Sequence, residues 1–102
     1  MDNAAATPVS ASALKAVVEI SKKFTGNPSG IHKEGRAARV VLEDARAEIA
    51  KAISARPDEI VFTSGATEAN NTAILGVVRE ARNRGVATPH IVVSAIEHPS
   101  VL

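Results

Sequence analysis

Cysteine, tryptophan and tyrosine are absent from this sequence, and only two phenylalanines occur among its 102 residues. The absence of cysteine excludes disulfide bonds, and three histidines spread along the chain offer no local pair of metal ligands. No apolar run approaches the roughly 20 residues of a membrane span, and no secretory signal is recognised at the start. We therefore expect a cytoplasmic protein with no metal site and no membrane contact.

Net charge is also nearly absent. Twelve basic and eleven acidic side chains leave a balance of +1, which gives no basis for binding nucleic acid. Hydrophobic residues make up 45% and charged residues 23% of the chain, as is ordinary for a globular protein. A chain of this length forms at most one domain with a modest core.

The most informative stretch that is present is TSGATEANN, at residues 63–71. It follows the apolar run at 60–62 and leads into a helical pattern. Where a strand turns through glycine and small hydroxyl residues into a helix, several backbone N–H groups point at one spot and favour an anion, most often a phosphate. Gly65 allows the backbone to approach such a ligand, and Ser64 and Thr67 add hydroxyl donors.

An ordinary helix N-cap provided by Ser64 or Thr67 is the competing interpretation of this turn. The stretch has neither the Gly-Lys-Ser/Thr of a Walker A loop nor a Gly-x-Gly-x-x-Gly fingerprint, so a nucleotide is not the first expectation. The spacing alone leaves both the cap and the phosphate site open.

Three helices are predicted along the chain. Ser10 is the expected N-cap of the first, which continues through Leu14. The glycine-rich loop at 26–30 is either a connector or a flexible wall of a site. A second helix is expected from about residue 32 to residue 53, with its charged face in solvent, and the third ends at Gly85. The predicted buried stripe of the second helix consists of Ala38, Leu42, Ala45, Ile49 and Ala52.

Two strands are predicted, at residues 59–63 and 90–94, because both runs favour β-structure and lack a polar alternation. With the helix between them they give the strand–helix–strand pattern of parallel α/β architecture. Ligands of such sheets bind beyond the carboxyl ends of the strands. Residues 64–67 follow the first strand and His98 follows the second, so we expect both at one crevice, where an imidazole can stack on a ring and move protons.

Simpler roles for the histidines stay open. His98 precedes Pro99, which suits the first position of a new helix, so His98 is also interpretable as a helix cap. His32 lies beside the glycine-rich loop, where a surface residue at a helix start is the simpler interpretation. His90 begins the second predicted strand and is expected to face solvent.

Four segments occur in a fixed order along the chain: DNAAATP at 2–8, GNPSGIH at 26–32, FTSGATEANN at 62–71 and EHPSV at 97–101. Together they resemble the N-terminal quarter of the cysteine desulfurases. These are pyridoxal-phosphate enzymes of the class V aminotransferase superfamily, with the fold-type I architecture. The resemblance covers essentially the whole chain.

The resemblance implies an incomplete α/β fold. Residues 1–55 would be the N-terminal segment and helices. Residues 56–102 would be the first β-α-β elements of the cofactor-binding large domain of a fold-type I pyridoxal-phosphate-dependent transferase.

The resemblance also implies a role for each matching residue. The turn that resembles the cradle of the cofactor phosphate consists of Ser64, Gly65, Ala66 and Thr67. His98 resembles the catalytic histidine that stacks on the pyridine ring and transfers protons. His32 resembles a histidine near the substrate that often faces the partner subunit's site. The segment that resembles the substrate side of the pocket includes Asn3, Ala4 and Ala5.

A cysteine desulfurase removes sulfur from L-cysteine, giving L-alanine and an enzyme persulfide for iron–sulfur cluster or thio-cofactor synthesis. The resemblance implies this function for a full-length homodimer with pyridoxal 5'-phosphate as cofactor and a sulfur-acceptor or scaffold protein as partner. The family's Schiff-base lysine, its aspartate partner of the pyridinium and its persulfide cysteine have no match here. We therefore expect an N-terminal fragment that is inactive alone.

Two alternatives stay open. One is a selenocysteine lyase or another class V aminotransferase-type enzyme, which the loop that contains the persulfide cysteine would distinguish. The other is a free-standing module that binds phosphate or a protein partner without catalysis.

Overall fold

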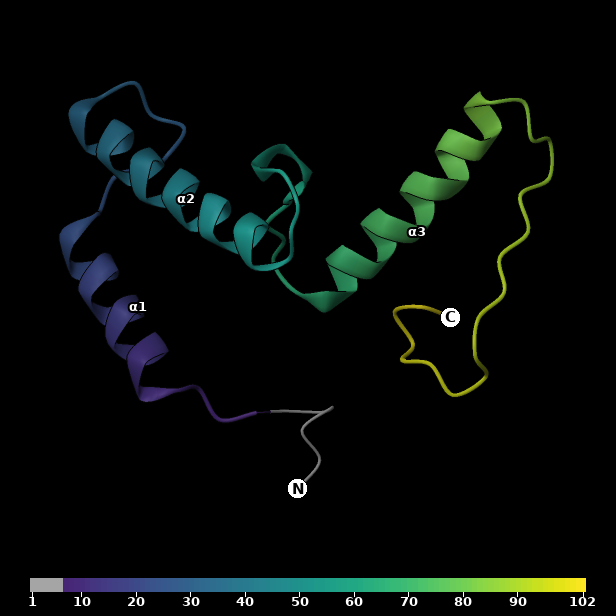
Figure 1. The fold of residues 1–102 in the computed structure, drawn as a ribbon, viewed down its shortest axis with the longest axis horizontal. Helices are drawn as coiled ribbons and strands as arrows, with labels where there is room; N and C mark the ends of the chain where they lie inside the picture. The colour runs from purple at the N-terminus through teal and green to yellow at the C-terminus, as the bar shows by residue number, and fades with distance from the viewer. Residues whose placement is uncertain (1–6) are drawn as a thin grey trace. The chain divides into compact units, whose positions relative to one another are not determined.

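The computed structural model describes residues 7–102. The regular elements of this range are three α-helices and one short 3-10 helix (Figure 1): α1 (Ala11–Lys23), α2 (Lys33–Ala52), η1 (Pro57–Glu59) and α3 (Ala66–Asn83). The chain divides into two units, of which one ends at Ile60 and the other begins at Val61. Each unit is described by itself below.

The helix α1 begins where the sequence predicts. The Ser10 side chain accepts a hydrogen bond from the backbone N–H of Ala13 at 3.2 Å, which satisfies one of the first N–H groups of the helix. None of its residues is buried, and Leu14 and Val17 are 57% and 59% exposed. No helix in the described range is both long and apolar enough to cross a membrane.

The glycine-rich loop lies against the first turn of α2 through direct backbone contact. A Cβ atom added at Gly35 would lie 2.6 Å from the carbonyl oxygen of Gly30 and 2.7 Å from that of Asn27. A Cβ at Gly26 would meet the backbone of Glu34 at a similarly forbidden distance. Gly35 is buried in this contact. The loop packs tightly on α2 because glycine on both sides of the contact leaves no side chain between the two backbones.

The buried face of α2 differs from the predicted stripe. Ala38 is 8% and Ala50 only 1% exposed, and η1 packs against this helix. Ala45, Ile49 and Ala52, which the pattern places in the stripe, are exposed. Helical periodicity identifies residues that share a face, but burial requires a covering segment. In the described range α2 is covered by the glycine-rich loop at its start and by η1, the one regular element that packs on it.

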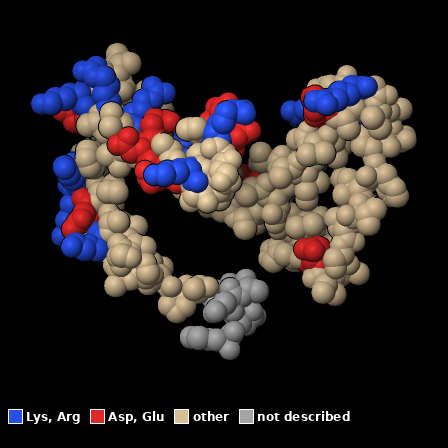
Figure 2. Space-filling model, in the orientation of Figure 1, with Lys and Arg blue, Asp and Glu red and all other residues tan. Residues whose placement is uncertain are grey.

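Arg46 is also predicted to face solvent, and this prediction is wrong. Its side chain is 20% exposed. The guanidinium donates to the Glu43 carboxylate at 2.9 Å and to the carbonyl oxygen of Ile60 at 2.5 Å. Arg46 therefore ties α2 to the chain that follows η1. Elsewhere on this unit, basic and acidic residues lie next to each other on the visible surface (Figure 2).

The two predicted strands do not form within residues 7–102. The first is replaced in part by η1, after which Ile60 is extended at φ −95° and ψ 123°. Residues 90–94 have no regular structure. A strand is stabilised by hydrogen bonds to a neighbour, and the described chain pairs neither segment, so Val61 and Val92 remain 70% and 86% exposed. The predicted β-α-β elements are therefore not confirmed.

The third helix agrees with the sequence pattern. α3 ends at Asn83, and Gly85 follows with φ 91°, a left-handed conformation that suits glycine after a helix. The N–H of Val86 donates to the carbonyl oxygen of Ala81 at 3.0 Å, which closes the helix end. The apolar side chains of α3 remain open to solvent, as Leu75 and Val77 are 60% and 71% exposed.

Candidate functional site

The turn that leads into α3 has an N-cap without a side-chain cap bond. Gly65 is the cap residue, and the first helical bond runs from the N–H of Ala69 to the Gly65 carbonyl oxygen at 3.1 Å. The Thr63 hydroxyl donates to the same oxygen at 3.1 Å. The interpretation of Ser64 or Thr67 as an ordinary N-cap is therefore wrong.

The missing cap leaves donors at the start of the helix. The backbone N–H groups of Ala66 and Thr67 precede the first helical bond and have no carbonyl partner in the helix. A Cβ atom added at Gly65 would meet no other atom within 4 Å, so the space beside the backbone is open. These N–H groups, with the positive end of the helix dipole, suit a phosphate or another anion.

One carboxylate already binds at this turn. A Glu68 carboxylate oxygen accepts from both the backbone N–H and the hydroxyl of Ser64, each at 2.7 Å. The hydroxyl bond, followed by the backbone bond, holds the pKa of Glu68 below its ordinary value of 4.5. Ser64 thus donates to an internal anion, and Ala66 and Thr67 provide the remaining donors. No role was predicted for Glu68 from the sequence, although an acidic residue in the first turn is a known helix-start signal.

His98 lies in a tight turn near the end of the described chain. Its Nδ1 accepts from the backbone N–H of Ser100 at 3.1 Å and lies 2.9 Å from the Ser100 hydroxyl oxygen. The N–H of Val101 donates to the His98 carbonyl oxygen at 2.8 Å. His98 therefore caps a single turn, whereas the simpler interpretation made it the cap of a helix. The helix expected from Pro99 extends no further than this single turn within the described residues.

Two asparagines of α3 hold this turn. The Asn70 side chain donates to the Ser100 hydroxyl oxygen at 2.9 Å. The Asn71 side chain donates to the carbonyl oxygen of Thr67 at 2.9 Å and to that of Ser100 at 3.4 Å. The turn that contains His98 and the first turns of α3 are thus joined by hydrogen bonds, while the predicted shared crevice at the ends of two strands stays a prediction. No role was predicted for Asn70, Asn71 or Ser100, although all three lie within the motifs at 62–71 and 97–101.

The other predicted site residues lie elsewhere. His32 belongs to the first unit, where it is the exposed N-cap of α2 without a side-chain cap bond. His90 is exposed, as expected. Asn3, Ala4 and Ala5 lie outside the described residues. No group of histidine, aspartate and glutamate residues within 7–102 is arranged to hold a metal ion.

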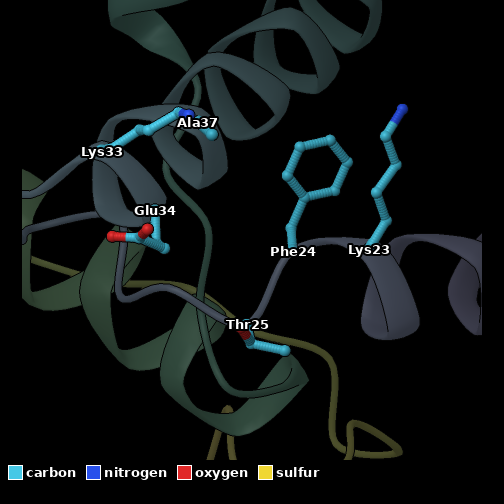
Figure 3. A pocket seen from close by; sticks show the side chains of 6 residues that line it. All are labelled: Lys23, Phe24, Thr25, Lys33, Glu34 and Ala37. Carbon is cyan, nitrogen blue, oxygen red and sulfur yellow. The ribbon is translucent and has the colours of Figure 1, made fainter.

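A separate small cavity of about 190 Å³ lies in the first unit. Its lining, drawn in Figure 3, consists of Lys23, Phe24, Thr25, Lys33, Glu34 and Ala37. The Lys23 ammonium lies 5.3 Å from the centre of the Phe24 ring, within the range of a cation–π contact. None of these residues is among the predicted site residues.

Comparison with known proteins identifies one family. A family model described as aminotransferase class-V matches residues 1–102. A cysteine desulfurase IscS of Dictyoglomus turgidum is 47% identical over 102 residues. A NifS/IcsS protein homolog of Lactobacillus delbrueckii subsp. bulgaricus is 43% identical over 100 residues. A selenocysteine lyase of Xenopus tropicalis is 39% identical over 110 residues.

These matches include nearly all of this chain but only part of each relative. They cover 100%, 98% and 99% of the chain, in the same order. The corresponding shares of the relatives are 25%, 25% and 26%. The chain thus spans about a quarter of the length of the curated relatives that it matches.

Proposed function

Because this chain belongs to the aminotransferase class-V family, we propose that it is part of a pyridoxal-phosphate-dependent cysteine desulfurase. The four motifs predict the family correctly. Cysteine desulfurases among the relatives match the chain from end to end at up to 47% identity, which supports the choice of activity within the family. The activity is that of the full-length protein, since the chain corresponds to a quarter of such a relative.

The observation that carries the proposal is the uncapped start of α3, linked through Asn71 to the turn of His98. The open N–H groups of Ala66 and Thr67 fit the dianionic phosphate of the cofactor. Gly65 leaves room for close approach, and the hydroxyls of Thr67 and Ser64 are the side-chain donors of the cradle. Binding at Ser64 would compete with the Glu68 carboxylate for the same donors.

Pyridoxal phosphate, when bound, supplies an electron sink for charge that develops on an amino-acid substrate. The residues of this chain provide orientation and proton movement. The turn at 64–67 fixes one end of the cofactor through its phosphate. His98 contributes an aromatic face for stacking and a ring nitrogen that accepts or returns a proton.

For the full-length protein we propose L-cysteine as substrate, and L-alanine and an enzyme persulfide as products. The sulfur would pass to an acceptor or scaffold protein for iron–sulfur cluster or thio-cofactor synthesis. We propose a cytoplasmic homodimer in which His32, with Asn3, Ala4 and Ala5, lies on the substrate side. The Schiff-base lysine and the persulfide cysteine have no match within residues 1–102, so this chain alone would be inactive.

A selenocysteine lyase is the second candidate, because a relative with that name is 39% identical over 99% of the chain. Both reactions remove a chalcogen from the β-carbon of an amino acid and leave alanine. The turn at the start of α3 and His98 would serve either reaction, so the substrate decides between them.

The experiment is to measure alanine formation by the full-length protein from L-cysteine and from L-selenocysteine. We expect turnover of L-cysteine. We also expect His98→Ala to reduce turnover by about 10²–10⁴-fold, the usual contribution of a general acid–base group, with the cofactor content largely retained. His90→Ala is the matched control, since His90 is exposed. Turnover of selenocysteine alone would favour the lyase, and normal turnover in His98→Ala would contradict the role of His98.

A further inference from the structure

His98, Ser100 and Asn70 form a continuous set of hydrogen bonds within residues 61–102. The His98 Nδ1 accepts from the Ser100 backbone N–H at 3.1 Å and lies 2.9 Å from the hydroxyl oxygen of the same residue. The Asn70 side-chain NH₂ donates to that oxygen at 2.9 Å. The imidazole is thereby connected to the second turn of α3.

The backbone N–H of Ser100 fixes the direction of these bonds. A backbone amide nitrogen only donates, so Nδ1 must present its lone pair to it. A hydrogen on Nδ1 would face the hydrogen of this amide, which is repulsive. Neutral His98 therefore has its proton on Nε2, because the hydrogen bond made by one ring nitrogen determines the state of the other.

Asn70 also influences which ring nitrogen of His98 has the proton, and it does so through Ser100. Its NH₂ group occupies a lone pair of the Ser100 hydroxyl oxygen, so the hydroxyl proton is directed towards Nδ1 and becomes a second donor to it. Asn70 and Ser100 are both half-buried, which limits competition from water. The Nε2 atom makes no hydrogen bond within residues 61–102 and stays available to contact a ligand.

We propose that Asn70 and Ser100 are positioning residues that hold neutral His98 in the Nε2–H tautomer, which makes Nε2 the atom that exchanges protons. The part about proton exchange rests on the proposed function, whereas the tautomer does not depend on it. Asn71 independently holds the Ser100 carbonyl oxygen at 3.4 Å. The turn therefore keeps one of its two links to α3 when Asn70 is replaced.

The test is nitrogen NMR of the full-length protein with isotope-labelled histidine, with and without cofactor, using His98→Gln to assign the signals. Protonated and unprotonated ring nitrogens of a neutral imidazole resonate far apart, so the tautomer ratio is measured directly. We expect the Nε2–H form to dominate in both states. Ser100→Ala removes one of two donors to Nδ1 and should lower the ratio of Nε2–H to Nδ1–H about 2- to 10-fold.

Asn70→Asp replaces the hydrogen-bond donor at this position by an acceptor and leaves the shape of the side chain almost unchanged. A carboxylate would accept the Ser100 hydroxyl proton, so that the hydroxyl lone pair turns towards Nδ1, and the preference for the Nε2–H form is reduced to that given by the Ser100 backbone N–H. Ser94→Ala is the matched control, because the Ser94 hydroxyl oxygen accepts from the N–H of Ile96 at 3.3 Å and has no bond to His98. Its tautomer ratio should equal that of the unmodified protein.

A dominant Nδ1–H form in the unmodified protein would overturn the proposal. So would ratios in Ser100→Ala and Asn70→Asp that equal the ratio in Ser94→Ala. If Ser100→Ala does not fold, Asn70→Asp decides, and Ser100→Thr should preserve the ratio because it retains the hydroxyl. Normal turnover in His98→Ala alongside a dominant Nε2–H form would contradict the proposed role of His98 in the reaction and leave the positioning itself supported.

Discussion

Replacing Gly35 by alanine is expected to detach the glycine-rich loop from α2. The added Cβ would lie 2.6 Å from the Gly30 oxygen and 2.7 Å from the Asn27 oxygen. Both are backbone atoms, so the whole loop must move to relieve the contact. Overpacking of this kind costs about 1–3 kcal/mol, whereas glycine to alanine in a helix gains about 0.5–1 kcal/mol. The two ranges differ by about 0–2.5 kcal/mol, and because both close contacts are to backbone atoms we expect a net loss in the upper part of this range, about 1–2 kcal/mol, in the stability of the docked loop.

Gly76→Ala in α3 is the matched control with the opposite sign. A Cβ at Gly76 meets no other atom within 4 Å. The substitution therefore keeps only the gain in helix propensity, about 0.5–1 kcal/mol. Circular dichroism of the 102-residue chain should show more helix in Gly76→Ala than in the unmodified chain.

The local assay is hydrogen exchange at the Gly30 amide, which donates to the Asn27 carbonyl oxygen at 2.8 Å in the docked loop. A loss of about 1–2 kcal/mol corresponds to exchange about 5- to 30-fold faster in Gly35→Ala. Gly76→Ala should leave this amide unchanged, since it lies in the other unit. Equal exchange rates in the two variants, or slower exchange in Gly35→Ala, would refute the argument from backbone contact.

Two further predictions concern single side chains. Because the folded pKa of Glu68 is below its ordinary value, its contribution to the stability of α3 is complete above about pH 4.5 and is lost as the pH falls through the lowered pKa. An acid titration of helicity should therefore show a smaller loss in Glu68→Gln than in the unmodified chain, and identical titrations would contradict the assignment. Arg46→Ala should destabilise the contact of α2 with the chain after η1 by about 1.5–3 kcal/mol, the range for hydrogen bonds from charged groups. Urea unfolding should show this loss in Arg46→Ala and not in Arg39→Ala, which alters an exposed arginine of the same helix.

The helices and the unpaired N–H donors at the start of α3 were predictable because their signals are local. Ser10 caps α1, and Gly85 follows α3, through contacts with residues a few positions away. The donors of Ala66 and Thr67 follow from helix geometry alone. The family followed from four motifs in order, which no composition or periodicity argument would provide.

The predicted strands and the predicted buried stripe required partners at long range. Residues 59–63 and 90–94 favour β-structure, but a strand is stabilised by its neighbours, and no pairing occurs within residues 7–102. Ile49 belongs to the apolar face of α2 yet is 42% exposed, because η1 is the element that packs on this helix in the described range. Arg46 is a charged residue that was predicted to be exposed but is partly buried, because its guanidinium donates to a carbonyl oxygen fourteen positions away.

The link between the turn of His98 and α3 could not be predicted for the same reason. Asn70 lies thirty positions before Ser100 in the sequence, and their hydrogen bond exists only because the chain after α3 returns to that helix. The motifs include His98, but the hydrogen bond from Asn70 to its neighbour Ser100 exists only where this segment returns to α3.

Titration of the cofactor-free full-length protein with pyridoxal phosphate tests whether the start of α3 holds the phosphate of the cofactor. A hydrogen bond to a charged group contributes about 1.5–3 kcal/mol, so Thr67→Val should bind the cofactor about 10- to 150-fold more weakly. Thr72→Val makes the same change at an exposed position of the same helix and should bind normally. Equal dissociation constants for Thr67→Val, Thr72→Val and the unmodified protein would contradict the phosphate assignment.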